Sequence, residues 1–191
     1  MTLWIRERAM PWRGRWSAAI WTTAAALLLV PAIAMRFDTG VNWTASDFVV
    51  MGVLLALTCG AFELATRMSG GWLSRAAFAV AVLGGFSMVW ANLAVGLVGD
   101  GFNPANAMFM GIPLAAAVGT LLVRFRTARM ARVMLVVAAL HALVGVVAVV
   151  GGWGLPVNGP LHTVGVTLFF MAPWLLSALL FRLAARTRSA D

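Results

Sequence analysis

The arginines of this chain form four short clusters, and the sequence between the clusters is almost purely apolar. Thirteen of the fourteen basic residues, all of them arginine, lie within 6–15, 67–75, 124–132 and 182–188, and only Arg36 lies between clusters. About fifty residues separate successive clusters, which is enough chain for two helices that each cross a bilayer. Basic residues that flank apolar segments are typical of a membrane protein with cytoplasmic basic loops.

The composition indicates the same class of protein. The chain has 191 residues, of which 62% are hydrophobic and 10% charged, and its mean hydropathy is +0.94. Such values favour a polytopic helical membrane protein over a soluble domain. In that setting the net charge of +8 indicates contact with anionic membrane lipids, and we expect no nucleic acid binding. The absence of lysine excludes Schiff-base and P-loop chemistry, and the single Cys59 excludes an internal disulfide.

Six apolar segments, each near the length that crosses a bilayer, follow one another at 17–35, 45–66, 76–98, 107–123, 133–152 and 163–181. Because the connections are short, neighbouring helices should run antiparallel. We therefore predict an all-α fold, a polytopic membrane protein with a bundle of six transmembrane helices arranged as three hairpins. The transmembrane domain is predicted at 17–182, with a cytoplasmic N-terminal segment at 1–16 and a cytoplasmic tail at 183–191. The positive-inside rule places both termini in the cytoplasm.

Small residues recur at a spacing of four in two of these segments. The two stripes are Gly52, Ala56 and Gly60, and Gly111, Ala115 and Gly119. A spacing of four puts small residues on one helix face, where another backbone can approach closely. The stripes belong to a weak internal repeat with an offset of 59 residues, which also pairs Arg67 with Arg126. Internal packing of the bundle is the simpler interpretation of the stripes, and dimerisation is the alternative.

A few polar residues near the predicted outer side are candidates for a binding pocket. They are Asp47, Asn92, Asn106 and His162, which would converge if the helices bundle compactly. The competing interpretation is structural: Asp47 and the turn 103–106 cap helices, and Asn92 makes one hydrogen bond between helices.

Two further ionisable residues lie within apolar segments. Glu63 precedes Arg67 by four residues, so it either forms an intrahelical ion pair or carries protons. His141 lies in the middle of its segment, where a hydrogen bond within the bundle, a proton relay or a haem contact are the alternatives. The other histidine, His162, is predicted at a different depth, which argues against a haem held by both.

Several motifs taken together resemble a known group of proteins. They are 43–48 (WTASDF), 62–65 (FELA), 90–96 (WANLAVG), 103–106 (NPAN), 124–126 (RFR) and 130–132 (MAR). This set is similar to small multi-pass inner-membrane proteins of proteobacteria that carry no assigned function. The resemblance implies the six-helix topology and a bacterial inner membrane, and it marks Asp47, Glu63, Asn92 and the 103–106 turn as signature positions. It implies no activity.

The sequence shows no set of residues typical of a catalytic or metal site, so we predict no catalytic residues, no metal and no cofactor. The first functional hypothesis is a non-enzymatic accessory, assembly or interaction subunit of a membrane complex. Its partners would be membrane lipids and either other membrane subunits or a second copy of the chain. A small transporter or channel with an outward-facing polar pocket is the second hypothesis, and a haem- or quinone-associated membrane protein is the third.

Overall fold

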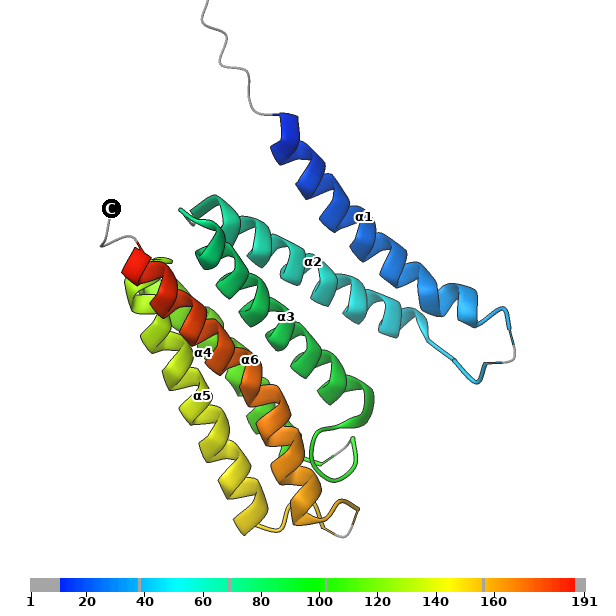
Figure 1. Ribbon diagram of the computed structural model, residues 1–191. Coiled ribbons are helices and arrows are strands. Elements are labelled where there is room, and N and C mark those ends of the chain that lie inside the picture. Colours follow the sequence, from blue (N-terminus) through cyan, green and yellow to red (C-terminus); the bar gives the residue numbers. More distant parts are fainter. Residues whose placement is uncertain (1–10, 38, 69, 102, 156, 188–191) are drawn as a thin grey trace, which may run out of the picture. The chain divides into compact units, whose positions relative to one another are not determined.

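The computed structural model describes residues 11–37, 39–68, 70–101, 103–155 and 157–187, with the backbone alone for residues 11–16. These residues form six α-helices and no strand (Figure 1). The helices are α1 (Pro11–Ala34), α2 (Ala45–Met68), α3 (Trp72–Val95), α4 (Asn106–Leu122), α5 (Thr127–Val150) and α6 (Pro160–Thr187). The prediction of an all-helical membrane protein is confirmed.

Five of the helices are long and apolar enough to cross a membrane. The exception among the described helices is α4, which has 17 residues and contains Pro113. At 1.5 Å per residue its length is about 25 Å, somewhat less than the roughly 30 Å of hydrocarbon in a bilayer. The arrangement of six spans as three hairpins therefore stays a prediction.

At the ends that carry arginine, several helices extend beyond the apolar segments predicted from the sequence. α3 begins at Trp72, α5 begins at Thr127 and α6 continues to Thr187, beyond the predicted domain boundary at 182. The helices extend past their apolar segments because arginine has a high helix propensity. In the other direction α3 ends early, at Val95, where Gly96 takes a positive φ of 76°. The predicted end of that span at residue 98 is wrong.

The chain divides into two compact units, and the boundary falls within α2 after Glu63. The N-terminal unit contains α1 and the part of α2 up to Glu63. A capping box begins α2: the Thr44 backbone N–H donates to Asp47 Oδ2 at 2.7 Å, and the Asp47 N–H lies 3.4 Å from Thr44 Oγ1. The Trp43 and Phe48 rings pack edge to face beside it.

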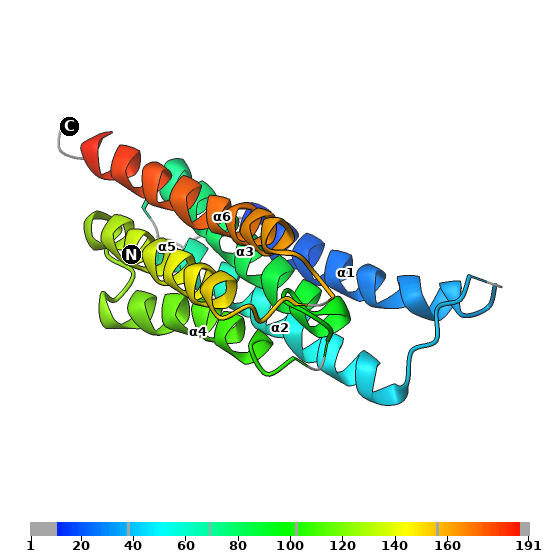
Figure 2. The ribbon, with the colours of Figure 1, turned by 90° about the horizontal axis from the view of Figure 1, so that it is seen from below.

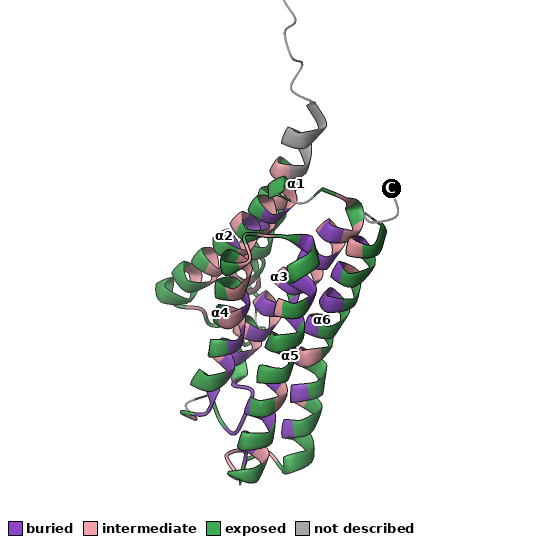
Figure 3. Ribbon diagram, turned by 90° about the vertical axis from the view of Figure 1, so that its left-hand side faces the viewer, coloured by how far each residue is buried: buried purple, intermediate pink, exposed green. Residues whose placement is uncertain are grey.

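The second unit contains α3 to α6, in which α4 and α6 each lie beside both α3 and α5 (Figures 1 and 2). All neighbouring pairs in this ring are antiparallel. Its interior is aromatic and aliphatic, and Trp174, Phe109 and Phe181 are among its largest fully buried side chains. In Figure 3 the buried residues lie mainly on the facing sides of these helices, while the outward sides are exposed. Exposed leucine and valine are expected on helices that face lipid.

Close contact between the helices of this unit depends on glycine. A Cβ atom on Gly84 would lie 2.5 Å from Cβ of Pro173, one on Gly145 would touch the Thr167 side chain, and one on Gly119 would lie 2.6 Å from Val133. Lipid supplies no hydrophobic drive for helix association, so such close packing is a main source of stability. Each of the four helices takes part in at least one of these contacts, and α5 and α6 each take part in two.

We expect Gly84→Ala to destabilise the second unit by about 1–3 kcal/mol, because the Pro173 ring is rigid and the two backbones must separate. Gly165→Ala is the matched control, since a Cβ there meets no atom within 4 Å. Thermal unfolding in detergent, followed by tryptophan fluorescence, compares the two variants. Equal melting temperatures would contradict the close approach of α3 and α6.

Candidate functional site

Four asparagines of the second unit gather at one end, in and beside the loops 96–105 and 151–159, which we call the asparagine end. Asn106, the first residue of α4, is its centre. Its Oδ1 accepts hydrogen bonds from the backbone N–H groups of Leu97 (2.9 Å) and Val98 (3.0 Å), and its Nδ2 donates to the Asp100 carbonyl at 2.9 Å. One buried amide thus satisfies three backbone groups of the loop that precedes it.

Asn92 connects α3 to the same point. Its Nδ2 donates to the Asn106 carbonyl oxygen at 2.8 Å, while its buried Oδ1 has no hydrogen-bond partner among the described residues. The structural interpretation of Asn92, one hydrogen bond between helices, agrees with this contact. The helix-cap interpretation of the turn 103–106 does not hold for Asn106, because its side chain turns back to the loop and Ala105 is the N-cap residue of α4, while Asn103 Oδ1 accepts the Ala105 N–H at 2.9 Å.

Two further asparagines join the two loops of the asparagine end reciprocally. Asn103 Nδ2 donates to the Trp153 carbonyl at 2.7 Å, and Asn158 Nδ2 donates to the Gly99 carbonyl at 2.8 Å. Each loop therefore both gives and receives one side-chain hydrogen bond. Each loop contains one asparagine in the sequence, but no sequence pattern revealed that the two asparagines bind each other's loop.

Glycines with positive φ make these contacts possible. Gly96 has a φ of 76° and Gly99 a φ of 68°. A Cβ on Gly96 would lie 2.8 Å from Asn106 Nδ2, and one on Gly99 would lie 2.5 Å from Asn103 Nδ2. The loop 96–105 thus needs glycine both for its backbone conformation and for the space that the two amides occupy.

Of the four predicted pocket residues, the structure brings Asn92 and Asn106 together. Asp47 lies in the N-terminal unit, where its side chain belongs to the capping box at Thr44, as the structural interpretation expects. His162 is exposed in the first turn of α6. A pocket formed by all four residues stays a prediction.

The carboxylate of Glu63 accepts hydrogen bonds from α1 of its own unit. Ser17 Oγ donates to Glu63 Oε1 at 2.9 Å, and Trp21 Nε1 lies 3.5 Å from Oε2. Glu63 thus joins α2 to α1 through a hydroxyl and an indole. The sequence suggested Arg67 as its partner and did not reveal these contacts, because residues 46 and 42 positions apart leave no local pattern.

His141 lies within the core of the second unit and is 0% exposed. Its ring packs edge to face on Phe109, with 5.8 Å between the ring centroids. Neither ring nitrogen has a hydrogen-bond partner in the described part of the chain. The expected hydrogen bond within the bundle is therefore not seen, and a haem could reach this ring only by displacing core side chains.

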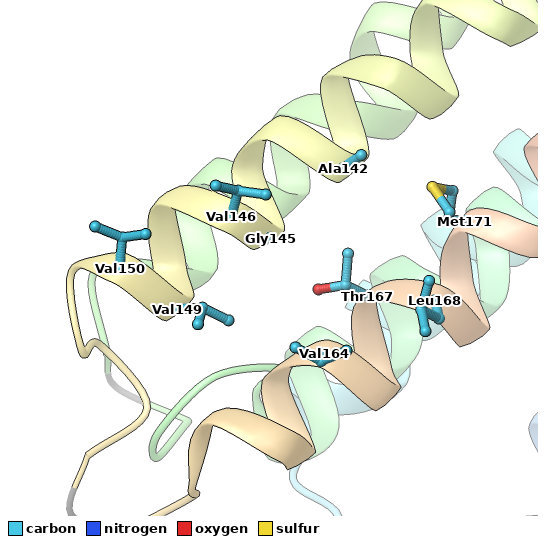
Figure 4. Close-up of a pocket in the computed structure, with 9 residues that line it drawn as sticks. All are labelled: Ala142, Gly145, Val146, Val149, Val150, Val164, Thr167, Leu168 and Met171. Atoms are coloured by element: carbon cyan, nitrogen blue, oxygen red, sulfur yellow. The ribbon is translucent and has the colours of Figure 1, made fainter.

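An apolar groove with a volume of about 250 Å³ runs between α5 and α6 (Figure 4). Its lining includes Val146, Val149, Val164, Leu168 and Met171. The one hydroxyl in this lining belongs to Thr167, and it donates to the Thr163 carbonyl of its own helix at 2.7 Å. The groove therefore offers aliphatic contact and no ionisable group. Within the described residues, no three His, Cys, Asp or Glu side chains lie close enough to hold a metal ion.

No protein-family model matches the chain, and no curated protein or solved structure matches it either. The similarity to proteobacterial inner-membrane proteins therefore stays a prediction.

We expect Asn106→Ala to destabilise the second unit by about 2–4 kcal/mol, because it leaves two backbone N–H groups and a carbonyl without their partner. Asn158→Ala removes one bond to a carbonyl and should cost about 1 kcal/mol. Thermal unfolding in detergent ranks the two variants. If both lost the same stability, Asn106 would not be the centre of the asparagine end.

Proposed function

We propose that this chain is a non-enzymatic integral membrane protein that serves as an accessory, assembly or interaction subunit of a membrane complex. The proposal places it in a bacterial inner membrane with both termini in the cytoplasm. Five long apolar helices support the membrane assignment. The orientation is supported by the second unit, where Arg75, the cluster 124–132 and Arg182 lie at the end opposite to Asp100. We call this end, where α3 and α5 begin and α4 and α6 end, the arginine end.

The observation that carries the interaction role is a difference between glycines of the two small-residue stripes. The space beside Gly119 is occupied by the Val133 side chain of α5, so this part of the α4 stripe serves internal packing. Gly60 of α2 and Gly111 of α4 are different, because a Cβ on either would meet no atom within 4 Å. Gly52 lies between these cases, since its Cβ would touch Leu28 at an ordinary 3.8 Å.

An open glycine on an apolar helix face is suited to a transmembrane helix of another subunit, because the two backbones can approach closely there. The asparagines support a structural role for the rest of the unit. Asn103, Asn106 and Asn158 all donate to loop carbonyls, which accounts for their positions without a substrate.

We expect Gly60→Leu and Gly111→Leu to abolish co-purification of a partner subunit in mild detergent while the protein stays folded. A Cβ at either position meets no atom within 4 Å of its own chain, so we expect the leucine to be accommodated there while it holds a second helix away. Gly165→Leu on α6 is the control, since Gly165 is equally open but lies outside both stripes. Mass spectrometry of the purified complexes identifies the subunits. A wild-type protein that purifies alone as a monomer would contradict the proposal.

Transport is the second candidate, and two polar groups favour it. The Glu63 carboxylate lies within an apolar helix, and the Asn92 Oδ1 is buried with no partner among the described residues. A carboxylate in such a position is a common proton carrier. The hydrogen bonds from Ser17 and Trp21 also give Glu63 a structural role, and for that reason we rank transport below the interaction role.

A further inference from the structure

Two aromatic side chains in the core of the second unit carry polar atoms without a hydrogen-bond partner among the described residues. His141 of α5 is 0% exposed, and both of its ring nitrogens are in this position. Trp174 of α6 is 1% exposed, and its Nε1 is in the same position. A buried polar group without a hydrogen bond is costly, and native proteins contain few of them. Each of these two side chains therefore needs a partner other than the described residues around it.

The packing of α5 against α6 brings the two rings into the same layer of the core. A Cβ on Gly145 would touch the Thr167 side chain, and this contact fixes the register of the two antiparallel helices. Two turns from it, toward the arginine end, Ala138 lies opposite Trp174, and His141 is one turn before Ala138. Helical side chains lean toward the N-terminus of their own helix. His141 therefore leans toward the arginine end and Trp174 toward the asparagine end, so both rings lie between these two levels.

The third polar group of this layer is a backbone carbonyl of α4. Proline has no N–H, so Pro113 does not donate the ordinary helical hydrogen bond to the Phe109 carbonyl oxygen. The Phe109 ring packs on the His141 ring, with 5.8 Å between their centroids. Trp174 reaches the same part of α4, because a Cβ on Gly85 would lie 3.4 Å from Trp174 Cη2 and 3.8 Å from Pro113 Cβ. The layer thus combines an acceptor of α4 with the two rings of α5 and α6.

We propose that the His141 ring, Trp174 Nε1 and the Phe109 carbonyl bind water in the core of the second unit. The ligand must be small and enclosed, because both side chains are almost fully buried. It must accept a hydrogen bond from the indole N–H, which only donates, so a metal cation does not fit. It must also donate to the carbonyl oxygen, which only accepts. Water does both, and bonds to the indole, the carbonyl and one imidazole nitrogen make the three that a buried water molecule typically forms.

This water lies near the middle of the membrane. His141 is nine residues from the end of α5, about 14 Å at 1.5 Å per residue, which is about half the thickness of the hydrocarbon region. The site explains why a histidine and a tryptophan, rather than two apolar side chains, occupy this part of the core. It does not depend on the open glycines of α2 and α4, so it stands apart from the interaction role.

Nuclear magnetic resonance of the full-length protein in deuterated detergent, isotope-labelled at the tryptophan nitrogens, tests the site directly. Trp174→Phe identifies the indole N–H signal of Trp174 by its disappearance. We expect the wild-type signal to show a through-space cross-peak to water, because the water oxygen accepts from Nε1. The cross-peak is measured in the rotating frame, where hydrogen exchange gives the opposite sign.

The two histidines of the chain provide matched variants for this measurement. His141→Leu should abolish the cross-peak, because it removes a partner of the water. His162→Leu is the control, since His162 is exposed on α6, and it should leave the cross-peak unchanged. His141→Gln keeps a donor and an acceptor at the site, so we expect it to retain the cross-peak.

Three results would overturn the proposal. A wild-type protein without a cross-peak between the Trp174 indole and water would do so whether or not the variants fold. An undiminished cross-peak in folded His141→Leu would remove His141 from the site. Equal loss in His141→Leu and His162→Leu would assign the signal to water at the surface of the protein.

Discussion

A lipid bilayer offers the peptide backbone no hydrogen-bond partner, and the structure of this chain follows from that constraint. Each apolar segment forms a helix because a helix satisfies its own N–H and C=O groups. Backbone N–H and C=O groups without an intrahelical partner remain at the helix ends. The two ends of the second unit differ in how side chains satisfy these groups. At the asparagine end, Asn103, Asn106 and Asn158 satisfy loop backbone from within the protein. At the arginine end, the starts of α3 and α5 lack a side-chain cap.

The same constraint explains how the helices associate. Lipid is as apolar as leucine, so burial of apolar surface does not favour a helix–helix contact over a helix–lipid contact. Close packing must supply that preference. Gly84 against Pro173 and Gly145 against Thr167 provide that packing inside the second unit. Glycines that are open within their own unit, such as Gly60 and Gly111, offer the same kind of contact to another helix.

The sequence predicted the helical class and most helix positions, because apolar length and arginine placement are properties of consecutive residues. It did not predict contacts between distant residues. The turn 103–106 was expected to cap α4, but the Asn106 side chain binds the loop before it, which depends on the positive φ of Gly96. The partners of Glu63 were missed for the same reason, since Ser17 lies on another helix. His141 was expected to be hydrogen-bonded, and no sequence pattern indicated that it faces Phe109.

The central claim is that the apolar helices cross a membrane with the arginine end in the cytoplasm. Single cysteines introduced in a Cys59→Ala background test it through labelling with a membrane-impermeant maleimide. Asp100→Cys and Val157→Cys report on the asparagine end, and Thr187→Cys, at the end of α6, reports on the arginine end; all three positions are exposed. We predict that Asp100→Cys and Val157→Cys are labelled from outside the cytoplasmic membrane, and Thr187→Cys only after that membrane is opened. Labelling of Thr187→Cys from the same side as Asp100→Cys would contradict the account.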